Sequence, residues 1–276
     1  MTLVGLAALL VASAERAEGQ ALVLPGSRPP TPIGEQQRSV KERRAPPAAA
    51  RAPSTARATA DTAGSARTIV GAPLFQDGRS GRIVIERGSD NQLLARLRVE
   101  GRQISNPTAA CAVELGMDEP VALVWLGAPR GLPRYQFAAP ICPIVFDVLE
   151  DAVLVADPEA TCRFAAADCE ARVGGLWGPM APALIAQAKA IERRRSRHER
   201  NLRDDFRALL RRLAGNAQRE AAAEQAGFSS DREMLCRGYD GEVEHGFCAE
   251  RVTAARVTAV KALLAVTPVP KKTTRP

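Results

Sequence analysis

Residues 199–263 read ERNLRDDFRALLRRLAGNAQREAAAEQAGFSSDREMLCRGYDGEVEHGFCAERVTAARVTAVKAL, and this stretch decides the fold of the second half of the chain. Apolar residues recur along it at intervals of three and four, which is the spacing of one helical face. Cys236 and Cys248 stand on either side of a short segment that contains Gly241 and Gly246. We therefore expect two helices joined by a turn, with a disulfide between these cysteines.

Another helix is expected upstream, beginning near Pro182, because proline is favoured in the first turn of a helix. It is expected to stop at Gly215-Asn216, since these two residue types adopt the left-handed conformation that caps helices. Arg195 interrupts the apolar stripe of this helix and is expected at its edge, with the charge in water. The stripe consists of Leu184, Ala188, Ile191, His198, Leu202, Phe206, Leu209 and Leu213.

The segment after Gly215 allows two interpretations. Either one continuous helix runs past Gly227, or Ser230 and Glu233 form a capping box that starts a new helix. A last helix is expected to carry Phe247, Val252, Ala255, Ala259 and Leu263 on one face. Three helices with short connections predict a small antiparallel bundle within residues 161–266.

Between residues 68 and 160 the hydrophobic period changes to two, which is typical of strands. In Leu93–Val99 the apolar residues alternate with Arg96 and Arg98, as in a sheet with one face in water. Trp125 is expected in the core, and Gly174–Gly178 is expected to form a tight turn with a packed Trp177 where two domains meet. The expected strands lie at 82–85, 93–99, 111–115, 121–126, 144–149 and 152–155. The predicted fold class is α+β: a small antiparallel β barrel or sandwich, followed by a disulfide-stabilised three-helix bundle.

The two ends of the chain have a different composition. The apolar run Leu3–Ala14 ends in Ala12-Ser13-Ala14 and predicts a signal peptide over residues 1–21, too short to span a bilayer. Residues 22–67 are rich in Pro, Ala, Arg, Ser and Thr, so we expect a disordered linker. Residues 267–276 are expected to form a disordered tail. No transmembrane span is expected.

Six cysteines in an exported chain predict three disulfides, formed by Cys111, Cys142, Cys162, Cys169, Cys236 and Cys248. Proximity in the sequence favours the pairs 111 with 142, 162 with 169 and 236 with 248, although other pairings stay open. The last pair would stabilise the fold by about 3 kcal/mol. An alternative is a metal site formed by the last four cysteines with His245 nearby. Because cysteines two to four residues apart are absent, we expect no metal.

The distribution of charge and of reactive side chains excludes several function classes. Residues 68–160 carry eight basic and twelve acidic side chains, whereas residues 161–276 carry twenty-one and fourteen. No aromatic stacking residue is interleaved with the arginines between Glu192 and Arg212, since Phe206 lies on the apolar stripe. We therefore expect a solvated basic face and no nucleic-acid partner. His198 and His245 are expected to be structural. The chain shows no nucleophile elbow, metal motif or phosphate loop, and therefore we expect no enzyme, no catalytic residue and no cofactor.

The stretch 199–263 resembles the LprI-type lysozyme-inhibitor family, whose members are small exported helical proteins with cysteine bridges. The resemblance rests on an acid, a leucine and an aromatic residue in one helix, and on a glutamine, an aromatic residue, an Arg-acid pair and a cysteine in the next. A second cysteine followed by threonine and arginine completes it. The matching residues are Glu199, Leu202, Phe206, Gln225, Phe228, Arg232, Glu233, Cys236, Cys248, Thr253 and Arg256.

The resemblance implies a periplasmic or secreted binding module that acts on a wall-cleaving glycosidase. Its residues also have a structural interpretation, in which Gln225, Phe228 and Arg232 face the partner helix and Arg232 and Glu233 are buried or half-buried. A different hypothesis is a structural or accessory envelope protein, which binds anionic envelope polymers through its basic helix. The resemblance covers less than a third of the chain, and the β region lies outside it.

Overall fold

The structure is a computed structural model that describes residues 69–269. The expected signal peptide (1–21) and linker (22–67) lie outside the described residues, as does the expected tail from residue 270 onwards. Among residues 69–269, no helix combines the length and the hydrophobicity needed to cross a membrane.

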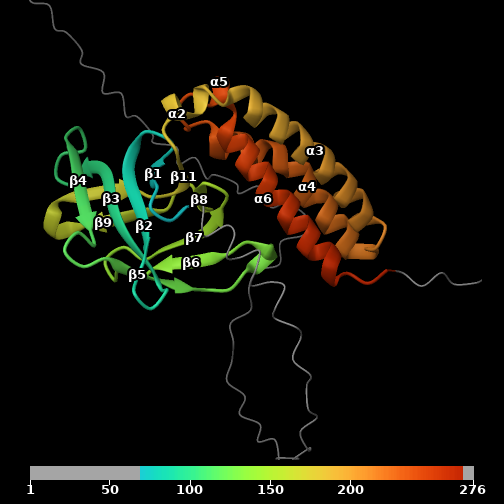
Figure 1. Cartoon of the computed structure of the whole chain (residues 1–276), viewed down its shortest axis with the longest axis horizontal. Helices are drawn as coiled ribbons and strands as arrows, with labels where there is room; N and C mark the ends of the chain where they lie inside the picture. Colours follow the sequence, from blue (N-terminus) through green and yellow to red (C-terminus); the bar gives the residue numbers. More distant parts are fainter. Residues whose placement is uncertain (1–68, 270–276) are drawn as a thin grey trace, which may run out of the picture. The chain divides into compact units, whose positions relative to one another are not determined.

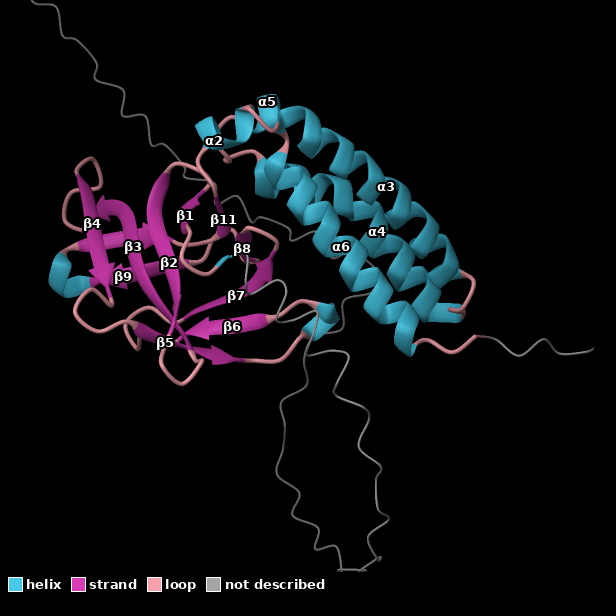
Figure 2. Ribbon diagram, in the orientation of Figure 1, coloured by secondary structure: helices cyan, strands magenta, loops and turns pink. Residues whose placement is uncertain are grey.

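The first part of the described chain is a β barrel (Figures 1 and 2). Eight strands close it in the order β2, β1, β11, β8, β7, β6, β5, β3, and the pairing of β3 with β2 completes the ring. Every pair of strands is antiparallel. The bounds are β1 (Pro73–Gln76), β2 (Ser80–Arg87), β3 (Leu93–Gln103), β4 (Ala110–Leu115), β5 (Val121–Trp125), β6 (Arg134–Phe137), β7 (Ile144–Leu149), β8 (Ala152–Val155), β9 (Thr161–Phe164), β10 (Cys169–Arg172) and β11 (Gly175–Gly178).

Strand β3 organises the barrel because it is the longest strand. Its first half pairs with β2 and β5, and its second half with β4 and β10. Leu93, Ala95, Leu97 and Val99 are buried and point inward, as the alternation in the sequence predicts. Phe137, Phe146, Phe164 and Trp177 fill the rest of the barrel core. The predicted antiparallel barrel is confirmed, and the alternative of a sandwich is not found.

The boundary expected at residue 160 lies too early in the chain. Strands β9, β10 and β11 belong to the same sheet and extend it to Gly178. Trp177 is packed as expected, but in strand β11 and not in a turn. Trp125 is not a core residue: it is 46% exposed at the end of β5, where its ring meets Tyr135 edge-on.

All six cysteines form disulfides, but two of the three pairings differ from the expected ones. The bonds are Cys111–Cys169, Cys142–Cys162 and Cys236–Cys248. In the sheet, Cys111 lies opposite Gly101 of β3 and Cys169 lies opposite Gln103 of β3, so the sheet brings together cysteines distant in sequence. The alternative of a metal site is wrong, because its four cysteines are all bonded to sulfur. Three disulfides indicate an extracytoplasmic protein.

The second part of the described chain is helical, and we call α2–α6 the helical unit. Its elements are α2 (Ala181–Ile185), α3 (Ala188–Leu210), α4 (Gly215–Cys236), α5 (Glu242–His245) and α6 (Phe247–Val266), and two 3-10 turns, η1 (Pro129–Gly131) and η2 (Ala165–Ala167), lie in barrel loops. The three long helices α3, α4 and α6 lie side by side (Figure 1). Helix α4 is continuous across Gly227, so Ser230 and Glu233 do not start a new helix. The helix expected from Pro182 is interrupted between Ile185 and Ala188, and it ends at Leu210, before the expected cap.

The barrel and the helical unit share a buried cluster. Leu149, Ala152 and Leu176 of the barrel pack in it with side chains from α2, α3, α6 and the end of α4. Close approach at the junction requires glycine, since a Cβ on Gly178 would collide with the ring of Phe247 and with the hydroxyl of Tyr239. That hydroxyl donates a hydrogen bond to the carbonyl of Pro179 (2.6 Å). The helical unit is therefore built onto the barrel wall.

Candidate functional site

Arg232 of α4 joins the three long helices. Its Nη1 donates to Thr253 Oγ1 of α6 (2.9 Å) and lies 3.4 Å from Glu199 Oε1 of α3. Thr253 is fully buried and donates its own proton to the carbonyl of Ala249 (2.6 Å). Arg195 Nε approaches the same Glu199 oxygen at 3.3 Å. Because a charged hydrogen bond is stronger than a neutral one, this network fixes α4 against α3 and α6.

A second contact between α4 and α6 lies about two turns of α4 before Arg232. Arg256 of α6 donates from Nε to Gln225 Oε1 (3.1 Å) and from Nη1 to Glu224 Oε1 (2.5 Å). The guanidinium groups of Arg232 and Arg256 lie over the ring of Phe228, at 5.6 and 5.8 Å from its centroid. Phe228 thus contacts two cations, which are attracted by the electron-rich face of an aromatic ring.

The residues that carry the family resemblance therefore come together, with one exception. Leu202 is buried in a cluster with Leu209, Val257 and Val260, and Phe206 packs against that cluster. Glu233 is exposed to solvent, so the expectation that it is half-buried is wrong. The others face the helix interfaces through the contacts described above. This arrangement agrees with the structural interpretation of the motif.

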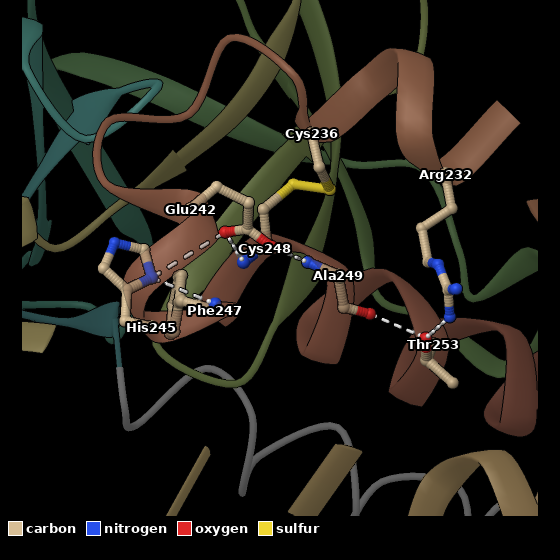
Figure 3. Close-up of a disulfide and its surroundings, with 8 residues drawn as sticks. All are labelled: Arg232, Cys236, Glu242, His245, Phe247, Cys248, Ala249 and Thr253. Carbon is tan, nitrogen blue, oxygen red and sulfur yellow. Dashed lines mark hydrogen bonds and ion pairs between the residues drawn. A yellow bond between two sulfur atoms is a disulfide. The ribbon is translucent and has the colours of Figure 1, made fainter. Parts of the chain in front are cut away.

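The turn between α4 and α6 is built around the disulfide Cys236–Cys248 (Figure 3). Gly241 and Gly246 enclose α5, and both have positive φ angles (67° and 65°) that favour glycine. The carboxylate of Glu242 accepts hydrogen bonds from the backbone N–H groups of Cys248 and Ala249, each at 2.9 Å. It thereby satisfies two donors that the first turn of α6 would otherwise leave unpaired.

His245 is buried in this turn as a structural residue. Its Nδ1 accepts a hydrogen bond from the backbone N–H of Phe247 (3.1 Å), and its Nε2 lies 2.8 Å from the carbonyl of Asp240. Since a carbonyl only accepts, the proton resides on Nε2. Both ring nitrogens are thus engaged by the backbone, and the ring has no nitrogen left to act as a base.

Burial changes the acidity of two groups in this region. It raises the pKa of Glu242, although the hydrogen bonds from Ala249 and Cys248 act in the opposite direction. Burial also raises the pKa of Tyr239 far above its ordinary range, and the nearby Glu242 acts in the same direction. The fold therefore disfavours the charged form of the Glu242 carboxyl group.

A buried ionic cluster lies at the start of α6, and the sequence interpretation missed it. Glu250 is 0% exposed, and its Oε1 lies 3.3 Å from His198 Nε2 and 3.5 Å from Arg194 Nε of α3. Arg251 is 3% exposed, and its Nη1 lies 3.0 Å from Glu250 Oε2. The same Nη1 also lies 3.1 Å from Glu150 Oε2, and Nη2 lies 3.4 Å from Asp151 Oδ2, in the turn between β7 and β8. A signal was present, because Glu250 and Arg251 stand at the start of a helix that is mostly apolar and rich in alanine.

Two cavities open between α3 and α4. The larger, of about 900 Å³, lies above the Cys236–Cys248 disulfide and is bordered by α3, α4 and α5. The smaller, of about 410 Å³, is lined by Leu202, Phe206 and Phe228 among others. Ser229 and Arg232 line both. In the larger cavity cationic and carboxylate side chains alternate, so its lining has no single sign of charge.

The solvent side of α3 carries a row of positive charges, which we call the α3 basic face. It comprises Lys189, Arg193, Arg197, Arg200, Arg207 and Arg211, all of them exposed. Intervals of three, four and seven residues place these six on one side of the helix. Arg207 lies 3.7 Å from Asp204. The other five make no ion pair with any carboxylate among residues 69–269.

No cysteine is free, and both histidines hold structural contacts. Within residues 69–269, no three His, Cys, Asp or Glu side chains are grouped so as to hold a metal ion. The unpaired cations of the α3 basic face are among the exposed groups that a partner could contact.

Comparison with known proteins finds no family model, no curated protein and no solved structure that matches this chain. The likeness to the lysozyme-inhibitor family therefore rests on the motif residues alone.

Proposed function

We propose that this protein is an exported, non-catalytic binding module of the cell envelope, periplasmic or secreted, which binds anionic envelope polymers through the α3 basic face. The observation that carries the proposal is the row of five exposed cations without a carboxylate partner. Such a row attracts polyanions, and no carboxylate among residues 69–269 pairs with these five cations. Unlike the five cations of the row, the acidic side chains Glu192 and Glu199 of α3 have a charged partner, since both pair with Arg195.

Binding to isolated cell-envelope material tests this proposal. The processed protein is incubated with sedimented envelopes at rising salt concentration, and the bound fraction is measured. We expect strong binding at low ionic strength and progressive release as salt screens the charges, because the Debye length falls from about 30 Å at 0.01 M to about 3 Å at 1 M. Binding that is undiminished at high salt, or no binding at all, would contradict the proposal.

A second candidate is inhibition of a wall-cleaving glycosidase, as the family resemblance implies. It is favoured by the convergence of Glu199, Arg232 and Thr253 beside the Cys236–Cys248 disulfide, at the positions that carry the resemblance. A basic enzyme would be repelled by the helical unit and attracted to the barrel, because residues 68–160 carry eight basic and twelve acidic side chains. Docking would then use the barrel.

Lysozyme activity on cell walls tests the second candidate. Excess protein is expected to slow lysis, and the variant Asp118→Asn/Glu119→Gln, at exposed positions between β4 and β5, is expected to slow it less. The matched control is Arg193→Gln/Arg197→Gln, which changes two charges on α3 and should inhibit as the parent does. Unchanged rates with excess parent protein would remove this candidate.

A further inference from the structure

The α3 basic face has the shape of a line rather than of a patch. From Lys189 to Arg211 it extends over about 33 Å at a rise of ~1.5 Å per residue. Successive cations are separated by three, four or seven residues, so the charges follow the helix axis without a long gap. Asp204 is the carboxylate that lies within the row, and its neighbour Arg207 pairs with it.

The polarity of α3 is divided between its two sides. The carboxylate of Glu199 turns towards Arg232 of α4, and Arg194 and His198 turn towards the buried Glu250 of α6. The ion pairs to α4 and α6 are thus made on the packed side of the helix, whereas on the solvent side Arg207 pairs with Asp204 and the other five cations of the row make no ion pair. The high arginine content of the chain does not by itself explain why one side of α3 is paired and the other is not, since arginine occurs on both sides.

The surroundings of the row argue against insertion into a lipid bilayer. The large apolar side chains that are exposed within residues 69–269 include none from α3. An interfacial helix needs apolar side chains beside its cations, because burial of apolar area supplies much of its membrane affinity. The α3 basic face offers charge and hydrogen-bond donors only. An anionic polymer in solution or at the wall surface can pair with these charges and accept these hydrogen bonds.

We infer that the α3 basic face binds a linear phosphate polymer, which lies along the helix axis. This inference rests on the proposed function and names the ligand class of the same site. Five of the six cations are arginines. The guanidinium group presents a planar fork of N–H donors that matches two phosphate oxygens, and it is always charged. A chain with phosphates at regular intervals contacts several of these forks at once.

Binding of long-chain inorganic polyphosphate to the full processed protein tests the inference. The affinity is measured between 0.05 and 0.3 M salt. For five neutralised phosphates we expect a slope of log affinity against log salt of about −3.5, from about −0.7 per contact for a flexible strand. Tripolyphosphate, which is too short to span the row, should bind far more weakly. Vesicles with an anionic phospholipid should not bind at salt concentrations at which polyphosphate does.

The variant Arg193→Gln/Arg197→Gln/Arg200→Gln assigns the effect to the row. It should lower affinity for long polyphosphate roughly 10- to 100-fold at 0.05 M salt and reduce the slope by about 2. The matched control is Arg82→Gln/Arg219→Gln/Arg237→Gln, which removes the same charge at exposed positions on β2 and α4 and just after it. It should retain most of the affinity and the full slope.

Three results would overturn the inference: equal loss of affinity in both variants, equal affinity for tripolyphosphate and long chains, or tighter binding to vesicles than to polyphosphate. Each is distinguishable from failure of the proposed function, because the envelope assay reports that separately. Salt-sensitive envelope binding that polyphosphate fails to compete would leave the proposed function standing and refute this ligand class.

Discussion

The barrel and the helical unit obtain their stability in different ways. The barrel buries four large aromatic side chains inside a closed ring of eight strands. Within the helical unit, by contrast, α4 spans 22 residues and contributes Cys236 as its buried residue. The contacts of α4 with its neighbours include a disulfide, the Arg232 network, the Arg256 contacts and the packing of the half-buried Phe228 and Leu235. Both regions are crosslinked, since the barrel contains Cys111–Cys169 and Cys142–Cys162. Because α4 buries little apolar surface, its position depends more on its crosslink and its charged contacts than the position of a barrel strand does.

The largest effect is expected where the two regions meet. Arg251→Met should lower the free energy of unfolding by about 3–5 kcal/mol, because it leaves the buried Glu250 without its closest cation and breaks the contacts to Glu150 and Asp151. Chemical denaturation followed by circular dichroism measures it. If the junction couples the two regions, both should unfold in one transition in the parent protein.

The double variant Glu250→Gln/Arg251→Met is the control for that prediction. It removes both charges, and replacing a buried ion pair as a whole is much less costly than breaking it. A double variant as unstable as the single one would show that packing, and not the unpaired charge, is responsible.

The next largest effect is expected on removal of one disulfide, either from the helical unit or from the barrel. Removing Cys236–Cys248 or Cys142–Cys162 by paired serine substitution should each cost about 3 kcal/mol in loop entropy, since the bonded residues are 12 and 20 positions apart. The structural consequences should differ. Without Cys236–Cys248 the amide protons of α4 should exchange faster with solvent, whereas without Cys142–Cys162 the exchange of α4 should be unchanged. Equal exchange in the two variants would contradict the contrast between the regions.

A smaller effect is expected within the Arg232 network. Thr253→Val keeps the shape of the side chain and removes the hydroxyl that accepts from Arg232, so it should cost about 1–2 kcal/mol. Thr258→Val is the matched control on the same helix. The Thr258 hydroxyl donates to the carbonyl of Ala254 (3.2 Å) and contacts no arginine. Thermal unfolding of both variants measures the difference, and similar losses would assign no special role to the network.

The smallest effect concerns the pH dependence of the turn. Burial raises the folded-state pKa of Glu242 above its unfolded value, so folding favours its protonated form. This contribution to stability is fully present below the unfolded pKa and is lost as pH rises through the folded pKa. Glu242→Gln, which is neutral throughout, should therefore show a flatter dependence of Tm on pH in the acidic range. A variant with the same pH profile as the parent would show that other groups dominate.

Much of the fold follows from local pattern. The alternation in Leu93–Val99 predicts β3, and the apolar stripe from Leu184 to Leu213 matches residues that are buried or half-buried. Strand β11 shows the limit of this reasoning. All four residues of Gly175–Gly178 are buried because the helical unit covers the outer face of the strand, so no alternation remains to be recognised.

The disulfide pairing in the barrel could not be obtained from proximity in the sequence, because it depends on which strands become neighbours. Strand β10 crosses close to β3 at Gly101, where a Cβ would collide with the carbonyl of Glu170. That contact is nonlocal, and it brings Cys169 to Cys111. For the site, the spacing of the arginines predicts the basic face, whereas the burial of Glu250 depends on the packing of α3 against α6.

The covering of the helical unit by Leu149, Ala152 and Leu176 bears on how such a protein can evolve. A protein fragment of residues 181–266 alone would expose to water the apolar surface that the β7–β8 hairpin now covers. Arg251 would lose its contacts with Glu150 and Asp151. In this chain the helical hairpin is consequently not a region that can be transferred to another protein on its own. Recombination that separates it from residues 69–178 should expose the apolar cluster and yield an insoluble product.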